Sequence, residues 1–159
     1  MFGTVGLVAV LVFVLIGCSP AEEPTTTDSG AGGTQPAGQE AVPLEGTSWN
    51  CIEFKVNDAP VTVPADAPIT AQFGADGTLS GSSGVNTYST GYTTSGTGIT
   101  IDSAIVTTKM AGPEDAMARE TSYLTVLPTA VSYQVDDKNG QLVLFGPADN
   151  TIARYTPAE

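Results

Sequence analysis

Short runs in which apolar and polar residues alternate, separated by turn-forming residues, cover most of the chain after residue 44. Val131, Tyr133 and Val135 alternate with polar neighbours, which is typical of a strand with one buried face. Asp76-Gly77 lies between two such runs and favours a hairpin. The pattern predicts strands at Thr47–Phe54, Ile69–Phe73, Thr78–Ser82, Asn86–Thr94, Gly98–Asp102, Ala104–Lys109, Val131–Val135, Gln141–Phe145 and Thr151–Tyr155.

One segment has helical periodicity instead. Pro113 suits the first position of a helix, and the two acidic residues after it suit the positive end of the helix dipole. The next apolar residues fall on one side at helical spacing, and Pro128 ends the pattern. They are Ala116, Met117, Tyr123, Leu124 and Leu127. We expect one amphipathic helix, about Pro113–Leu127, whose apolar side packs on the sheet rather than binding a partner. The domain is therefore predicted to be mostly β, a β-rich α+β fold.

The first residues of the chain are almost continuously apolar. Val5–Ile16 carries no charge, and its length of about twelve residues is too short to span a bilayer. It leads into Leu15-Ile16-Gly17-Cys18, which resembles the lipobox of bacterial lipoproteins. We expect residues 1–18 to be a lipoprotein signal peptide and Cys18 to be the lipidated residue, with acyl chains such as palmitate anchoring the protein to a membrane. The alternative is a free cysteine in a hydrophobic membrane helix.

The segment after Cys18 predicts a tether. Residues 19–43 are rich in Pro, Gly, Ser and Thr, and Val42 is the one large aliphatic residue among them. Such a composition cannot bury enough apolar surface to fold, so we expect disorder. Residues 44–159 remain for one domain. The expected location is the cell envelope: the outer membrane, facing the periplasm, in a Gram-negative organism, or the outer face of the cell membrane in a Gram-positive one.

Charge and composition exclude several functions. The net charge is −12, and the domain holds 13 of the 17 acidic residues and all five basic ones. Such an acidic surface repels phosphate backbones, so no nucleic-acid partner is expected. The chain has no histidine, which removes the commonest general base and the commonest metal ligand. We therefore expect no enzyme activity, no metal and no cofactor.

The remaining reactive side chains have simple structural explanations. Five aspartates fall at predicted turns, where Asp is favoured for local hydrogen bonds: Asp76, Asp102, Asp136, Asp137 and Asp149. Paired catalytic carboxylates, and with them a hydrolase with an unrecognised site, are the less favoured interpretation. Cys51 follows Trp49 in a predicted strand and is expected to be a small buried hydrophobe, the alternative being an exposed thiol that could oxidise.

Several motifs, in order, resemble the META/HslJ-like domain, over about Leu44–Tyr155. They are Trp49, Gly81-Ser82-Ser83-Gly84-Val85-Asn86-Thr87-Tyr88, Tyr92, Thr107-Thr108-Lys109-Met110-Ala111, the helix and a closing hairpin. The resemblance implies a small antiparallel barrel-like β domain with one covering α-helix. Because members of this family are often envelope lipoproteins, we expect a non-enzymatic role in interaction with an envelope protein or in envelope stress tolerance. The alternative is a barrel that binds a small apolar ligand.

The same resemblance bears on individual positions. The family commonly has cysteines where this chain has Val85 and Gly112, and it implies that these form a disulfide between strands that meet. Asn86, Tyr88 and Tyr92 match recurring positions of the family and are a candidate binding surface. The alternative, which is the favoured interpretation, is that Asn86 satisfies backbone groups at a bend while the tyrosines pack inside the domain.

Overall fold

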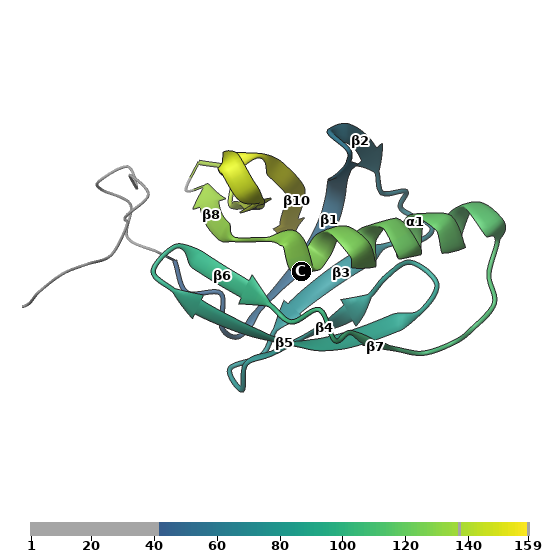
Figure 1. Ribbon diagram of the computed structural model, residues 1–159, viewed down its shortest axis with the longest axis horizontal. Coiled ribbons are helices and arrows are strands. Elements are labelled where there is room, and N and C mark those ends of the chain that lie inside the picture. Colours follow the sequence, from purple (N-terminus) through teal and green to yellow (C-terminus); the bar gives the residue numbers. More distant parts are fainter. Residues whose placement is uncertain (1–41, 137, 159) are drawn as a thin grey trace, which may run out of the picture. The chain divides into compact units, whose positions relative to one another are not determined.

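A computed structural model describes residues 42–136 and 138–158 of the protein (Figure 1). The expected signal peptide, Cys18 and residues 19–41 of the expected tether lie outside the described residues. The strands are β1 (Thr47–Val56), β2 (Ala59–Thr62), β3 (Ile69–Phe73), β4 (Thr78–Ser82), β5 (Thr87–Ser95), β6 (Gly98–Ile101), β7 (Val106–Thr107), β8 (Ser132–Asp136), β9 (Gln141–Phe145) and β10 (Thr151–Pro157). The helices are α1 (Glu114–Val126) and two 3₁₀ helices, η1 (Leu127–Thr129) and η2 (Pro147–Asp149).

Eight strands close into an antiparallel barrel. Around the ring they follow the order β1, β3, β4, β5, β6, β8, β9 and β10, and β10 pairs back with β1. β2 lies beside β1, and β7 lies beside β5, both off the ring. The expected fold class, a small antiparallel barrel-like β domain with one α-helix, is confirmed. No helix among the described residues is long and apolar enough to cross a membrane.

The ring is held unevenly. β1 and β10 pair over five register positions, as do β8 and β9. β6 and β8 meet at a single register pair, Gly98 with Ser132. Two further backbone bonds support this seam, from Ile99 N to the Val131 carbonyl (3.1 Å) and from Tyr133 N to the Thr97 carbonyl (2.8 Å). The β6–β8 seam is therefore the most lightly bonded joint of the barrel.

Alternation along the strands places aromatic side chains inside the ring. In β1, Trp49 and Cys51 are buried, and in β5, Tyr88, Thr90 and Tyr92 are buried. The largest side chains that are almost fully covered are Tyr123, Tyr155, Phe54, Phe73, Leu44, Ile69, Leu79, Leu127, Leu142 and Leu144. Large side chains thus occupy the barrel interior, as in small barrels that hold no ligand.

The α-helix covers this core (Figure 1). α1 lies within one residue of the predicted bounds at each end, and Pro128 falls in η1, where it ends the regular helix. Its buried residues are Ala116, Glu120 and Tyr123, followed by Leu127. Tyr123 packs edge-on against Phe54, with the ring centroids 5.5 Å apart. The expectation that the apolar side of the helix packs on the sheet is met.

Two strand predictions were wrong. β2 was not predicted; it contains Pro60, which is tolerated because this strand lies off the ring. The strand predicted at Ala104–Lys109 is reduced to Val106–Thr107. Two extra residues before β7 interrupt the pairing with β5. After β7 one backbone bond remains, from Thr108 N to the Thr87 carbonyl (3.1 Å), and Thr108 and Met110 then bond to the side chain of Asn86.

Candidate functional site

Asn86 lies at the bend between β4 and β5 and is 2% exposed. Its Nδ2 donates to Oε1 of Glu120 (2.8 Å) and to the carbonyl of Met110 (3.3 Å). Its Oδ1 accepts from the backbone N–H of Met110 (2.7 Å) and from the hydroxyl of Thr108 (2.9 Å). Since an amide side chain offers two donor hydrogens and two acceptor lone pairs, its capacity is fully used inside the protein.

Glu120, on α1, is the hydrogen-bond partner of Asn86 and carries a buried carboxylate. The residue is 6% exposed, and its carboxylate accepts from the hydroxyl of Ser83 (2.7 Å), from Asn86 N (2.8 Å) and from Asn86 Nδ2 (2.8 Å). Burial works to raise the pKa of Glu120, but the hydrogen bonds from Ser83 and Asn86 outweigh it and hold that pKa below the ordinary value. Glu120 therefore stays ionised while buried.

These contacts form one cluster, the Asn86–Glu120 network, made of Ser83, Asn86, Thr108, Met110 and Glu120. It fastens α1 and the segment before it onto the bend between β4 and β5. The hydroxyl of Ser83 donates to the carboxylate, and its oxygen lies 2.9 Å from the Asn86 carbonyl, so both residues are bonded within the domain. A carboxylate bonded on both oxygens is poorly placed to act as a base, so the arrangement suits positioning rather than catalysis.

Sequence reasoning missed Glu120 and Ser83. The signal was present, because Ala116, Glu120, Tyr123 and Leu127 repeat at spacings of four, three and four residues, which places Glu120 within the apolar stripe. A charged residue at such a position indicates a buried acid with a dedicated partner.

Three tyrosine hydroxyls form a second buried chain. The hydroxyl of Tyr88 donates to the carbonyl of Thr70 (2.9 Å) and lies 3.2 Å from that of Tyr123, which in turn lies 3.1 Å from that of Tyr155. Burial raises the pKa of all three phenols, most strongly for Tyr123 and Tyr155. The hydroxyls therefore remain protonated and serve as internal hydrogen-bonding groups.

The three residues of the candidate binding surface do not share an exposed face. Asn86, Tyr88 and Tyr92 are 2%, 2% and 5% exposed. The hydroxyl of Tyr92 donates to the carbonyl of Gly74 (2.9 Å), and its ring packs edge-on against Phe73 at 5.0 Å. The structure therefore has the alternative arrangement, in which Asn86 bonds at a bend and both tyrosines pack in the core.

Cys51 is also covered. It is 5% exposed, and burial raises the pKa of its thiol to about 12. Its Sγ donates weakly to the carbonyl of Glu53 (3.5 Å). The expectation of a small buried hydrophobe is confirmed, and the thiol is neither ionised nor accessible at neutral pH.

Val85 and Gly112, which stand where the family commonly has cysteines, do lie together. A β-carbon at position 112 would lie 3.5 Å from Cβ of Val85. The expectation that these positions lie in strands is wrong, because Val85 falls in a bend and Gly112 in the loop before α1. The Asn86–Glu120 network brings the two loops together instead.

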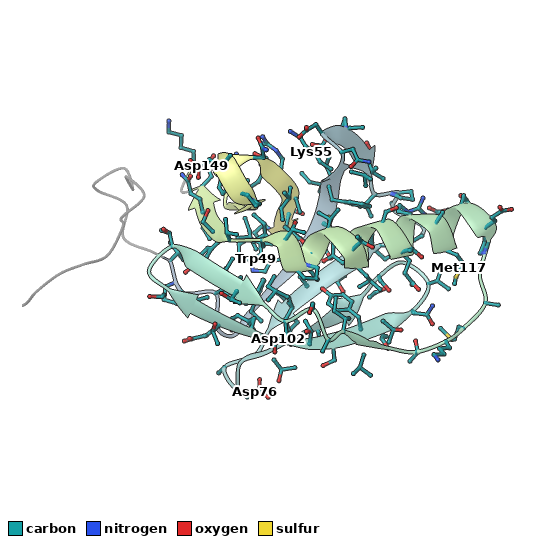
Figure 2. The ribbon with its side chains drawn as sticks, viewed as in Figure 1. Trp49, Lys55, Asp76, Asp102, Met117 and Asp149 are labelled. Atoms are coloured by element: carbon teal, nitrogen blue, oxygen red, sulfur yellow. The ribbon has the colours of Figure 1, made fainter. Side chains whose placement is uncertain are left out.

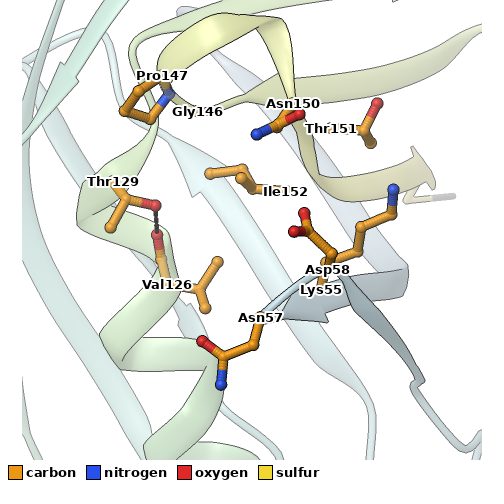
Figure 3. Close-up of a pocket in the computed structure, with 10 residues that line it drawn as sticks. All are labelled: Lys55, Asn57, Asp58, Val126, Thr129, Gly146, Pro147, Asn150, Thr151 and Ile152. Carbon is orange, nitrogen blue, oxygen red and sulfur yellow. Dashed lines mark hydrogen bonds between the residues drawn. The ribbon is translucent and has the colours of Figure 1, made fainter.

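An open groove lies between the β1–β2 hairpin, the end of α1 and the loop before β10 (Figure 3). Its volume is about 200 Å³, below the roughly 300–1,000 Å³ of ordinary small-molecule sites. It is lined by Lys55, Asn57, Asp58, Val126, Thr129, Gly146, Pro147, Asn150, Thr151 and Ile152. The groove is open to solvent and is lined by both polar and apolar side chains, so it does not form an enclosed ligand cavity.

Two of the five aspartates assigned to turns make local side-chain bonds. Asp76 accepts from the backbone N–H of Thr78 (3.0 Å), and Asp136 accepts from that of Lys138 (2.9 Å). Asp137 lies outside the described residues. Within residues 42–136 and 138–158, no three His, Cys, Asp or Glu residues are grouped so that they could hold a metal ion.

Comparisons with known proteins place this fold. The sequence profile of the META domain matches residues 42–159. The chain is similar to a protein from Burkholderia xenovorans solved by NMR, with a TM-score of 0.60, 22% identity, and coverage of 79% of this chain and 98% of that one. It is also similar to a DUF4847 family protein from Bacteroides vulgatus, with a TM-score of 0.48, 18% identity, and coverage of 71% and 93%. No curated protein matched significantly.

Proposed function

Because the chain belongs to the META domain family, we propose that it is a cell-envelope lipoprotein whose domain is a non-enzymatic module for contact with another envelope protein. The observation that carries the non-enzymatic part is the Asn86–Glu120 network. The best candidates for chemistry, Glu120, Ser83 and Asn86, are buried and bonded to one another. Groups committed in this way hold the fold and are themselves closed to a substrate.

The envelope part of the proposal is supported by the sequence at the amino terminus. Leu15-Ile16-Gly17-Cys18 closes a short apolar segment, in the order that a lipobox requires. A diacylated or triacylated Cys18 would anchor the domain stably at a membrane surface, where a role in envelope stress tolerance would be exerted. The acidic domain, with 13 acidic and five basic residues, favours a protein partner over nucleic acid or anionic lipid.

The alternative function, a barrel that binds a small apolar ligand, is less well supported. Tyr123, Tyr155 and Phe54 project into the barrel interior and are at most 1% exposed. The groove of Figure 3 is open and lined by both polar and apolar side chains, and it is not an enclosed apolar cavity.

Mass spectrometry of the full chain produced in a bacterium tests the anchor. The expected product begins at Cys18 and carries acyl chains, while Cys18→Ala remains an unprocessed precursor. An unmodified thiol at Cys18, or wild-type protein found in the cytosol, would show that the proposal is wrong.

Crosslinking in intact envelopes tests the partner. We expect the wild-type chain to yield a specific crosslinked envelope protein that is lost with Cys18→Ala, since that variant no longer reaches the same surface. Recovery of no species above background from correctly acylated protein would contradict the interaction role.

A further inference from the structure

The outer surface of β1, β3, β4 and β5 carries two aligned rows of small polar side chains, here called the hydroxyl face. The first row follows the strand register through Ser48, Gln72, Ser80 and Ser89, and ends at Val106 on β7. The second row, Asn50, Thr70, Ser82 and Thr87, follows the same register, with Ser82 N donating to the hydroxyl of Thr70 (2.9 Å).

All of these side chains point outward. Their neighbours along the strands are buried in the barrel: Trp49, Cys51, Ala71, Phe73, Leu79 and Tyr88. Alternation in a strand sends successive side chains to opposite faces, so the two rows are exposed or half-buried on the other side.

The hydroxyl face is free of charge in a strongly acidic protein. The 25 residues Gly77–Ile101 contain no Asp, Glu, Lys or Arg, although the chain carries a net charge of −12. Acidic residues lie at its borders instead (Figure 2), where Asp76 occupies the β3–β4 turn and the carboxylate of Asp102 lies over Gly91. The face is thus a neutral surface with acidic residues at one edge.

This pattern fits a second copy of the same chain. Hydroxyl and amide groups both donate and accept, so identical rows can pair with each other across a two-fold axis, which carboxylates cannot do. Outside the face the domain carries 13 acidic and five basic residues, so contact there is opposed by an excess of like charge. Val106, which is 72% exposed at the end of the first row, adds an apolar contact.

We propose that two copies associate through the hydroxyl face. The face spans β1, β3, β4, β5 and β7, and the four spacings of roughly 4.8 Å between them give about 19 Å across. Its two rows lie about 7 Å apart along the strands, so its area is far below the roughly 800 Å² per partner of a standard interface, and the association is weak and depends on concentration. The proposal rests on the proposed function in one respect, because anchoring at a membrane supplies the high local concentration.

Sedimentation of the full acylated chain in detergent, across a range of concentrations, tests the inference. We expect a monomer–dimer equilibrium that Thr87→Glu with Ser89→Glu weakens at least about tenfold, because it places four like charges in the interface. The matched control is Thr121→Glu with Thr125→Glu, which adds the same charge to exposed positions on α1 and should leave the dimer intact. Thermal unfolding checks that both variants are folded.

A second measurement does not depend on the glutamate variants. With Ser89→Cys, the rate at which a maleimide labels the new thiol should fall as protein concentration rises, whereas with Thr121→Cys it should stay constant. Raising the salt concentration should strengthen the dimer, because salt screens the repulsion between two copies that are both acidic.

A monomer at every concentration, or equal loss of dimer in both glutamate pairs, would overturn the inference. Protection of Ser89→Cys that requires a different protein would overturn it too. The acylation state of Cys18 is read separately by mass spectrometry. An unmodified Cys18 therefore defeats the proposed function, while an acylated monomer defeats only the proposal of self-association.

Discussion

The carboxylate of Glu120 joins segments that lie more than thirty residues apart in the chain. It accepts from Ser83 and from the main chain and side chain of Asn86, and Asn86 in turn holds the backbone of Met110. A buried charge in such a network stabilises the fold only while its partners are present, because loss of one partner leaves the others unsatisfied.

Glu120→Gln should therefore destabilise the domain. The amide would turn a donor toward either Ser83 or Asn86, both of which donate to the carboxylate in the wild type. We expect the free energy of unfolding to fall by about 1–3 kcal/mol, measured by urea denaturation at neutral pH. Glu45→Gln, at an exposed position, is the control and should change it by less than about 0.5 kcal/mol. Equal effects of the two variants would contradict the role of the network.

The lowered pKa of Glu120 predicts a pH dependence. Because the folded state holds the pKa below its unfolded value, the unfolded state binds more protons on acidification, and stability falls as pH falls. The contribution is complete above about pH 5 and is lost progressively below about pH 4. The stability difference between wild type and Glu120→Gln should shrink over that interval in urea titrations at several pH values. A constant difference would argue against an ionised Glu120.

The tyrosine chain predicts an asymmetry between two similar variants. Tyr123→Phe leaves the hydroxyl of Tyr155 without its hydrogen-bond partner, whereas Tyr155→Phe leaves Tyr123 still bonded to Tyr88. We expect Tyr123→Phe to cost about 1–2 kcal/mol of unfolding free energy and Tyr155→Phe to cost less than about 1 kcal/mol. Thermal and urea unfolding measure both, and the reverse order would show that the hydroxyls do not act as a chain.

Single residues were predictable where local chemistry decides. Cys51 was expected to be buried because a free cysteine in a strand usually is, and Asp76 was expected to bond locally because it lies in a turn. The burial of Tyr92 and the partner of Asn86 depend on residues distant in the sequence. No local pattern supplies those contacts.

At the scale of elements, turn chemistry and periodicity located most strands and the helix. β3, β4 and β9 have the predicted bounds, because each is closed by glycine-containing turns such as Asp76-Gly77. Two elements were not predictable. β2 follows a tight turn in which Asn57 and Asp58 have positive φ. β7 is short because the segment after it bonds to the side chain of Asn86.

The two loops that meet at Val85 and Gly112 predict an engineered disulfide. Val85→Cys with Gly112→Cys should oxidise spontaneously, because the β-carbons would be about 3.5 Å apart, within the range that disulfides require. Closing this loop should raise the free energy of unfolding by about 3–4 kcal/mol on the chain-entropy model. Urea unfolding with and without reductant measures the gain.

The single variants serve as controls for the disulfide. Gly112→Cys alone should be destabilised, because its β-carbon would meet the methyl groups of Val85 at 2.8 and 2.9 Å. Free thiols that persist in the double variant under oxidising conditions would mean that the loops do not approach as described.

At the scale of the whole molecule, we expect the barrel to open first at the β6–β8 seam. Only Gly98 and Ser132 pair there in register, with bonds from the amides of Ile99 and Tyr133. In native-state hydrogen exchange these two amides should exchange at least about tenfold faster than the paired amides of β1. Uniform protection around the ring would indicate that the barrel opens only as a unit.

The mostly β class followed from strand periodicity, but closure of the ring did not. Alternation identifies which face of a strand is buried and leaves open which strands become neighbours. The pairing of β1 with β10 joins the two ends of the domain, and no local sequence pattern in either strand predicts it. The barrel was expected through the resemblance of the motifs instead.

That pairing also fixes the order of events when the protein is made. Trp49 sits opposite Pro157, so the domain is not a finished ring until almost its last residue is available. If the polypeptide crosses a membrane amino terminus first, β1 remains without its partner β10 during transit, because contacts between distant segments form late. Late closure of the barrel is compatible with secretion, since a channel for unfolded chains would receive a domain in which β10 has not yet paired with β1.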